Sequence, residues 1–137
     1  MPSSSESVRR PADADRCPCG SGDAFGACCA PFLAGAPAPT AAQLMRSRYT
    51  AYVVGDAGYL VATWHASTRP TELELDPDLE WRALAILRTE RGGPFDRDGV
   101  VEFVASWRDG AERGRLHETS RFVREAGRWC YVDGEVG

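Results

Sequence analysis

The sequence predicts an α+β protein, in which a small cysteine-rich segment and two helices precede a run of antiparallel strands. Three observations support this fold class. Four cysteines cluster between Cys17 and Cys29, apolar residues recur at helical spacing from Ala41 to Val54, and apolar and polar residues alternate after Trp81. Helices and strands that are segregated along a chain in this way are typical of helices packed on one face of an antiparallel sheet.

The composition favours a compact domain without a membrane segment. Of the 137 residues, 43% are hydrophobic and 26% are charged, as in ordinary globular chains. No run approaches the roughly 20 apolar residues that cross a bilayer, and residues 1–16 contain no apolar signal-peptide core. We therefore expect a cytoplasmic protein with no membrane insertion.

The charge balance argues against a nucleic-acid partner. The formal net charge is -4, from 16 basic and 20 acidic residues, and every basic residue is arginine. A net acidic chain lacks the long-range field that drives non-specific binding to phosphates. Because the arginines are spread along the chain and interleaved with acidic residues, we expect no nucleic-acid binding.

The chain divides into three parts. Residues 1–16 are polar, interrupted by proline and without periodicity, which predicts a mobile tail. Residues 17–35 form a cysteine motif, and residues 36–137 form the α+β domain. Between them, the stretch from Pro31 to Thr40 is expected to be an extended connector, because each proline biases the residue before it away from helix.

The cysteine motif has the pattern C-x-C-x8-C-C, formed by Cys17, Cys19, Cys28 and Cys29. Four thiolates suit tetrahedral zinc, and a shell closed by four protein ligands leaves no position for a reacting water. We therefore expect one structural Zn²⁺, whose removal should unfold this segment and leave the later domain folded. Two alternatives are disulfides between the two cysteine pairs, which would close short strained loops, and redox chemistry. The isolated Cys130 is expected to be a small buried hydrophobe.

Two helices follow the connector. Thr40, with a glutamine three residues later, forms a capping box at the start of a helix from Ala41 to about Val54. Gly55 supplies the C-terminal stop. Asp56 can cap a second, shorter helix that must end before Pro70.

Alternating apolar and polar residues predict the sheet. The expected strands are Trp81 to Glu90, Gly99 to Trp107, Arg115 to Glu125 and Arg128 to Val132. The last two are joined by a tight turn at Ala126-Gly127. On the third strand, His117 and Glu118 point to opposite faces unless the strand carries a bulge.

The segment CPCGSGDAFGACC, from Cys17 to Cys29, resembles the SEC-C motif. That motif is a zinc-binding module at the end of the preprotein translocase ATPase, where it docks a partner. Its fourth ligand there is a histidine, which Cys29 replaces here. The resemblance implies docking of a protein partner through the zinc motif, and the apolar residues available for this are Phe25, Phe32 and Leu33.

Two later stretches, LMRSRYTAYVVGDAGYLVATWHASTRP and RLHETSRFVREAGRWCYVDG, are similar to the YchJ-like family of bacterial proteins. That family joins an SEC-C motif to a domain similar to nuclear transport factor 2 (NTF2), and the resemblance spans Cys17 to about Gly134. It implies an NTF2-like cone, in which N-terminal helices pack on a curved antiparallel sheet that can enclose a cavity. No established activity comes with the resemblance.

Four residues are candidates for a small-molecule pocket in such a cavity: Arg46, Tyr49, His65 and Glu118. His65 follows the second helix and is the better general-base candidate, with capping of the helix end as the alternative. Arg46 is expected to pair with Glu118 or to anchor an anionic ligand. No Ser-His-Asp order and no phosphate-binding glycine loop accompany them, so no catalytic residue is assigned.

These observations favour a non-enzymatic, zinc-containing binding or adaptor protein. Its zinc motif would dock a protein partner, and its cone would offer a small-molecule pocket. One alternative is a small-molecule enzyme of isomerase, dehydratase or hydrolase type that uses the same cavity. A second alternative is a filled cavity in a domain that serves only as a dimerisation scaffold.

Overall fold

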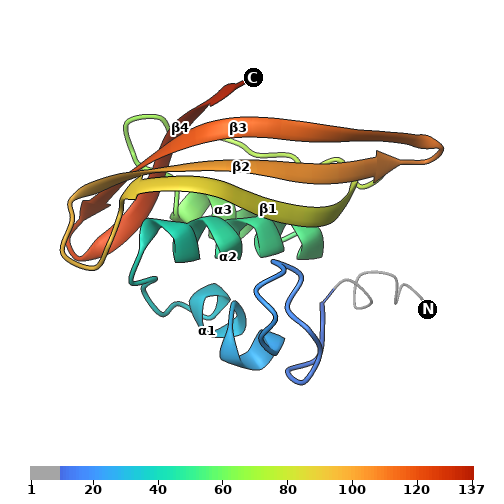
Figure 1. Ribbon diagram of the computed structural model, residues 1–137, viewed down its shortest axis with the longest axis horizontal. Helices are drawn as coiled ribbons and strands as arrows, with labels where there is room; N and C mark the ends of the chain where they lie inside the picture. The colour runs from blue at the N-terminus through green and yellow to red at the C-terminus, as the bar shows by residue number, and fades with distance from the viewer. Residues whose placement is uncertain (1–9) are drawn as a thin grey trace.

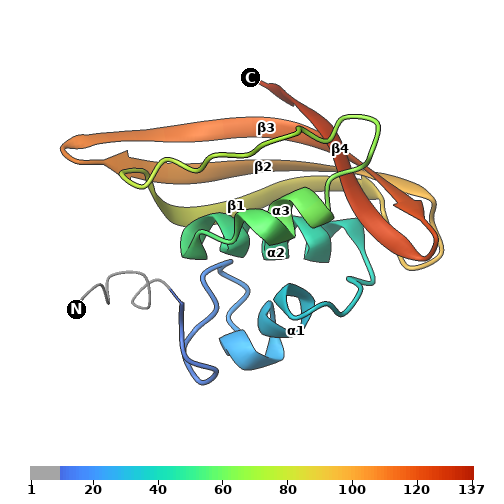
Figure 2. The ribbon, with the colours of Figure 1, turned by 180° about the vertical axis from the view of Figure 1, so that it is seen from behind.

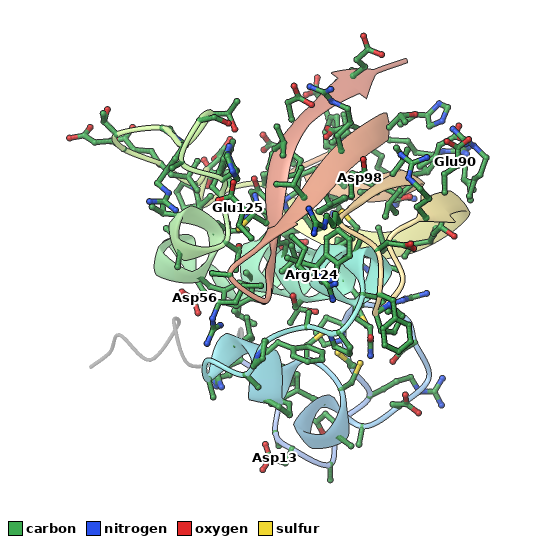
Figure 3. The ribbon with its side chains drawn as sticks, turned by 90° about the vertical axis from the view of Figure 1, so that its left-hand side faces the viewer. Asp13, Asp56, Glu90, Asp98, Arg124 and Glu125 are labelled. Atoms are coloured by element: carbon green, nitrogen blue, oxygen red, sulfur yellow. The ribbon has the colours of Figure 1, made fainter. Side chains whose placement is uncertain are left out.

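A computed structural model describes residues 10–137 as a stack of the cysteine motif, a helical layer and a sheet (Figure 1). The same order of layers is visible from behind in Figure 2. In Figure 3, Asp13 lies at the motif end of the stack, whereas Glu90 and Asp98 lie at the sheet end. The elements, in chain order, are η2 (Phe25–Ala27), α1 (Ala30–Leu33), α2 (Ala41–Val54), α3 (Ala57–Ala62), β1 (Glu80–Arg91), β2 (Asp98–Asp109), β3 (Glu112–Glu125) and β4 (Arg128–Val136). The α+β class expected from the sequence is confirmed.

The two predicted helices begin and end where their capping residues place them. The N–H of Gln43 donates to Thr40 Oγ1 at 3.1 Å, and Gly55 ends α2 with a left-handed φ of 77°. The N–H of Tyr59 donates to Asp56 Oδ1 at 3.0 Å at the start of α3. Among the described residues, no helix is long and apolar enough to cross a membrane.

The sheet has four antiparallel strands in sequential order, β1-β2-β3-β4. The β2–β3 hairpin is longer than predicted, because pairing continues through Arg108↔Arg113 and Asp109↔Glu112. Along β2 the alternation is as predicted: Phe103 is buried toward the helices, and its neighbour Glu102 lies on the open face.

The predicted extended connector is partly helical. Residues Ala30–Leu33 form α1, and Pro31 occupies its first turn. A proline is tolerated there because its missing N–H would have no intrahelical partner in any case. The expectation that proline keeps this whole segment extended was wrong for that reason.

The polar N-terminal segment contributes to the motif. Residues 1–9 of the predicted mobile tail lie outside the described residues. The rest packs against η2: the N–H of Phe25 donates to Asp15 O at 2.7 Å, and the N–H of Gly26 donates to Asp13 O at 2.9 Å. A Cβ at Gly26 would lie 2.7 Å from the Asp13 Cβ, so glycine permits this close approach. Residues 13–15 therefore belong to the folded motif, unlike the expected tail.

A single hydrophobic core runs from the cysteine motif through α2 to the sheet. It joins residues of the motif, of α2 and of the strands: Cys17, Cys19, Phe25, Cys29, Leu44, Met45, Tyr49, Phe103, Phe122 and Trp129. The indole N–H of Trp129 donates to Pro39 O at 3.2 Å, which fastens β4 to the connector. The motif is thus built into the domain and is not a separately packed appendage.

Candidate metal centre and cavity

The four motif cysteines meet at one point. Their Sγ atoms all lie within 4.8 Å of one another, and the Cys19 and Cys28 sulfurs are 3.6 Å apart. Sulfurs on a tetrahedral zinc, at ~2.3 Å from the metal, are separated by about 3.8 Å. A disulfide would need about 2.05 Å, and all four cysteines are free thiols. The geometry is that of a metal-ligand set.

The loop between the cysteine pairs turns tightly under the sulfurs. Gly20 and Gly22 have φ angles of 81° and 93°, which residues with a side chain rarely adopt. Ser21, between them, places its hydroxyl 3.1 Å from Cys28 Sγ. A hydroxyl donor at a coordinating sulfur disperses the negative charge of the thiolate.

The thiols are crowded and largely buried. Cys17, Cys19 and Cys29 are 3%, 0% and 1% exposed. Hydrogen bonds from Cys17 and Cys29 lower the pKa of the Cys19 thiol, whereas the bonds to Cys17 and Cys19 raise that of Cys29. Burial raises the pKa of Cys28 to about 11. Without a cation, the thiols therefore cannot all ionise together, and a divalent metal removes that conflict.

Helix α2 supports this centre from one side. Thr50 Oγ1 donates to Cys29 Sγ at 3.4 Å and lies 3.9 Å from Cys17 Sγ. One turn earlier, Arg46 Nη1 donates to Cys19 O at 2.8 Å. Thr50 was not identified from the sequence; its spacing of four residues from Arg46, on the same helix face, is the signal that could have found it.

The expected pairing of Arg46 with Glu118 is therefore wrong. Arg46 faces the cysteine motif, and it is Arg48 that faces the sheet. Two residues along a helix are separated by about 200°, so only one of these arginines can face the cavity. The residue expected there from the sequence was Arg46, whereas Arg48 occupies that position.

A cavity of about 150 Å³ lies between α2 and the inner face of the sheet. Its walls combine apolar side chains, three tyrosines and two charged groups: Met45, Trp81, Phe103, Ala105, Leu116, Tyr49, Tyr52, Tyr131, Ser120, Arg48 and Glu118. Two of the four candidates, Tyr49 and Glu118, line it, whereas Arg46 and His65 are not among its lining residues. Burial raises the pKa of Tyr49 to about 12, so its hydroxyl stays neutral at physiological pH.

Arg48 is a buried cation, only 3% exposed. Its Nη1 donates to Leu60 O at 2.8 Å and to Thr63 Oγ1 at 2.7 Å, which ties α2 to the end of α3. The guanidinium carbon lies 5.0 Å from the Trp64 ring centre and 4.5 Å from that of Tyr131. Burial lowers the pKa of Arg48, and the faces of the two rings offset part of the desolvation.

Glu118 is held on the opposite side of the cavity. Its Oε2 accepts hydrogen bonds from Ser120 Oγ at 2.7 Å and from Tyr131 OH at 3.2 Å. A Cβ at Gly134 would overlap the Glu118 carboxylate, so this carboxylate would have to move if the glycine were replaced. His117 binds Glu102 Oε2 at 2.7 Å on the other face of the sheet, which confirms that His117 and Glu118 point in opposite directions.

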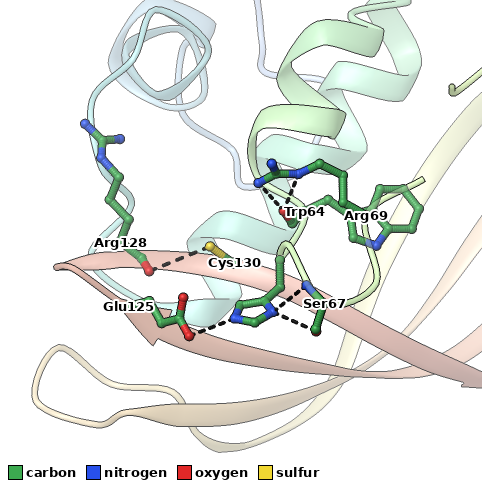
Figure 4. A network of polar contacts seen from close by, with 7 residues as sticks. Trp64, Ser67, Arg69, Glu125, Arg128 and Cys130 are labelled. Atoms are coloured by element: carbon green, nitrogen blue, oxygen red, sulfur yellow. Dashed lines mark hydrogen bonds and ion pairs between the residues drawn. The ribbon is translucent and has the colours of Figure 1, made fainter. Parts of the chain in front are cut away.

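His65 takes part in a turn after α3, in which the N–H of Thr68 donates to His65 O at 3.1 Å. Figure 4 shows its partners Ser67 and Glu125. Its Nε2 lies 2.8 Å from Glu125 Oε2, and its Nδ1 accepts the N–H of Ser67 at 3.1 Å. In the same network Cys130 is half-buried, with its thiol directed at the Arg128 carbonyl. The structure thus separates His65 from the cavity residues with which it was grouped.

The arginines are less dispersed than the sequence indicated. Four of them surround a hollow of about 420 Å³ at the end of the β2–β3 hairpin: Arg82, Arg108, Arg113 and Arg115. Antiparallel pairing places Arg108 directly opposite Arg113, although they are separated along the chain by acidic residues. The absence of a nucleic-acid partner stays a prediction.

Fold and site together define a class of small α+β proteins in which a four-cysteine motif is joined to an NTF2-like domain. Models of known families match both parts of the chain. Residues 14–31 match the SEC-C motif, and residues 40–134 match the middle NTF2-like domain of YchJ. The chain belongs to the YchJ-like family, as the resemblance predicted.

Several known proteins are similar to this chain over most of its length. A UPF0225 protein of Chromobacterium violaceum is 54% identical over 125 residues, which cover 88% of this chain and 92% of that protein. A UPF0225 protein of Streptomyces coelicolor is 52% identical over 120 residues, which cover 87% of this chain and 94% of that protein. The solution structure of a SEC-C motif containing protein from Rhodopseudomonas palustris aligns with a TM-score of 0.78 at 33% identity, covering 90% of this chain and 99% of the other. The crystal structure of a SEC-C motif containing protein from Psychrobacter arcticus aligns with a TM-score of 0.73 at 25% sequence identity. The alignment covers 91% of this chain and 84% of the other.

Proposed function

We propose that this protein is a non-enzymatic binding protein, in which one structural zinc ion fastens the SEC-C motif to α2 and the cavity under the sheet receives a small molecule. The observation that carries the proposal is the position of the four sulfurs, which lie within 4.8 Å of one another in the same core as α2 and the sheet. A metal there cross-links segments that are otherwise too short to hold a core of their own.

The donor set favours zinc in a structural role. Four cysteine thiolates are soft ligands and complete a tetrahedral shell, so a bound zinc would have no open position for substrate or water. Thr50 and Ser21 supply the surrounding hydroxyl donors. The zinc would act on stability and architecture, and ligand binding would belong to the cavity.

Docking of a protein partner through the motif stays a prediction, but its apolar surface is smaller than expected. Phe25 is 1% exposed, and Phe32 and Leu33 are half-buried against the core. The exposed residues of the motif are those of the polar loop around Ser21 and Asp23 and a few small apolar residues, such as Ala27, Pro31 and Ala34. A partner would therefore be recognised through this polar loop and small apolar contacts, and not through large apolar side chains.

The enzyme alternative depends on the ionisable groups that line the cavity. Neither histidine of the chain lines it, and the acid-base candidates there are Glu118, the Tyr131 hydroxyl that donates to it, and the hydroxyls of Tyr49 and Tyr52. A catalytic Glu118 would have to exchange a proton with substrate. The hydrogen bonds from Ser120 and Tyr131 hold the Glu118 carboxylate in a fixed position, which suits a binding group.

Two measurements test separately whether the protein holds zinc, whether its cavity binds a small molecule, and whether it converts that molecule. Elemental analysis of reduced protein should give about one equivalent of zinc in the wild type and in the control Cys130→Ser, and far less in Cys19→Ser. Mass spectrometry of small molecules released from the cavity should recover them unchanged after prolonged incubation. Absence of zinc in the wild type would overturn the metal centre, and conversion of a bound compound would establish the enzyme alternative.

A further inference from the structure

We propose that the cavity binds a small zwitterion of the amino-acid class, with its carboxylate on Arg48, its ammonium group on Glu118 and an apolar side chain between them. This inference rests on the proposed function, in that the cavity takes a small molecule at all. It is carried by two opposite charges that line one cavity without touching each other.

The first step is the unused donor capacity of Arg48. Both of its hydrogen bonds to described residues come from Nη1, and they go to a carbonyl and a hydroxyl. Its Nε and Nη2 donate to no described residue, and no carboxylate among them lies within 4.0 Å of the guanidinium. A buried cation without a contacting anion is costly, and a guanidinium with free N–H groups is suited to a carboxylate.

The second step is the free oxygen of Glu118. Ser120 and Tyr131 both donate to Oε2, so Oε1 has no donor among the described residues. A ligand ammonium group supplies N–H donors and a positive charge at once. Gly134, whose Cβ would collide with this carboxylate, leaves the room that Glu118 occupies.

The third step is the exclusion of singly charged ligands. An anion drawn to Arg48 is repelled by Glu118, and a cation drawn to Glu118 is repelled by Arg48, because both charges line the same low-dielectric cavity. A molecule that carries both charges can pair its anionic group with Arg48 and its cationic group with Glu118. Discrimination therefore arises from the pair and not from either residue alone.

The fourth step is size and wall chemistry. The volume of about 150 Å³ is comparable to cavities that hold a benzene-sized molecule, which excludes nucleotides and other large ligands. Met45, Phe103 and Leu116 give the cavity apolar walls. The side chain that fits is a short aliphatic or thioether chain, as in valine, leucine, isoleucine or methionine.

The experiment is calorimetric titration of the zinc-loaded, reduced protein with these four L-amino acids. The strongest binder is then compared with two analogues that each lack one charge; for leucine these are isocaproate and isoamylamine. We expect at least one amino acid to bind, and each analogue to bind about tenfold or more weakly, because a charge-assisted hydrogen bond is lost.

Variants locate the binding. Glu118→Gln should weaken the amino acid about tenfold and leave isocaproate unweakened, since the repulsion of the anion is removed. Arg48→Lys keeps the positive charge but loses the planar guanidinium that can bind a carboxylate through two N–H groups. Arg48 also connects α2 to α3, so this variant can fail to fold. In that case the Glu118→Gln variant is the decisive one. The exposed Arg115→Gln, outside this cavity, is the control and should bind as the wild type does.

Three results would overturn the inference. One is equal affinity for the amino acid and both analogues, another is unchanged amino-acid affinity in Glu118→Gln, and the third is failure of all four amino acids to bind at about 1 mM. Cavity binding of a singly charged or neutral compound in any of these cases would leave the proposed function standing. A cavity that binds no compound from a broad panel would remove both.

Discussion

Thr50 donates a hydrogen bond to Cys29 across 3.4 Å, from the middle of α2 to the last cysteine of the motif, and both residues are at most 1% exposed. A neutral hydroxyl buried against a sulfur has no solvent to replace its partner. The pair therefore couples the four-cysteine cluster to the helix whose other face lines the cavity. Metal occupancy and the stability of the domain should depend on each other.

Replacing Thr50 with valine tests that coupling. Thr50→Val keeps the shape of the side chain but removes the donor, so zinc should bind about 10- to 100-fold more weakly, as is found for partners that support metal ligands. Competition with a coloured chelator measures the change. The matched control is Thr119→Val on the open face of the sheet, where zinc affinity should not change. Equal affinity in the two variants would contradict the role given to Thr50.

Removal of the metal should affect more than the motif. The sequence alone led us to expect local unfolding, with the later domain left intact. Because Cys17, Cys19 and Cys29 share a core with Leu44 and Phe103, we now expect chelation to disturb α2 and β2 as well. Amide NMR spectra recorded before and after chelation give the answer. Spectral changes restricted to residues 17–35 would contradict this prediction and would show that the motif unfolds independently of the rest of the domain.

Phe25 should behave as a core residue. Truncation to alanine removes a fully buried ring and should lower the free energy of unfolding by about 3–5 kcal/mol, a large part of the stability of a domain of this size. Phe95, which is 94% exposed, is the matched control, and Phe95→Ala should change stability by no more than about 0.5 kcal/mol. Urea unfolding of the zinc-loaded proteins measures both. A near-neutral Phe25→Ala would indicate that this ring is free to dock elsewhere.

The buried tyrosines predict a loss of stability at alkaline pH. Burial raises the pKa of Tyr49 from 10.0 to about 12, and it also raises the pKa values of Tyr52 and Tyr131. The folded state therefore holds these protons more tightly than the unfolded state does. Their contribution is complete below pH 10 and is lost as the pH rises from 10 through 12.

The measurement is the urea midpoint at a series of pH values above 9, with tyrosinate absorbance recorded in parallel. Tyr52→Phe cannot ionise at this position, so its stability should fall less steeply with pH than that of the wild type. Parallel curves for the two proteins would show that Tyr52 titrates normally in the folded state.

The sequence alone determined the two capped helices, the faces of the strands and the cysteine cluster, because these depend on short-range chemistry. The bonds to Thr40 and Asp56 are made within three residues, the strand faces follow from alternation, and the four sulfurs lie on one short loop segment. Each of these features can be predicted from neighbours along the chain.

Only the tertiary structure decided which arginine faces the cavity and whether Phe25 is exposed. Helix α2 lies between the motif and the sheet, so it is buried on more than one side (Figures 1 and 2). Its buried residues are Ala41, Leu44, Met45, Ser47, Arg48, Tyr49, Thr50 and Ala51. A helix that is covered on two sides has no single apolar stripe, so periodicity cannot assign its faces, and long-range packing must do so.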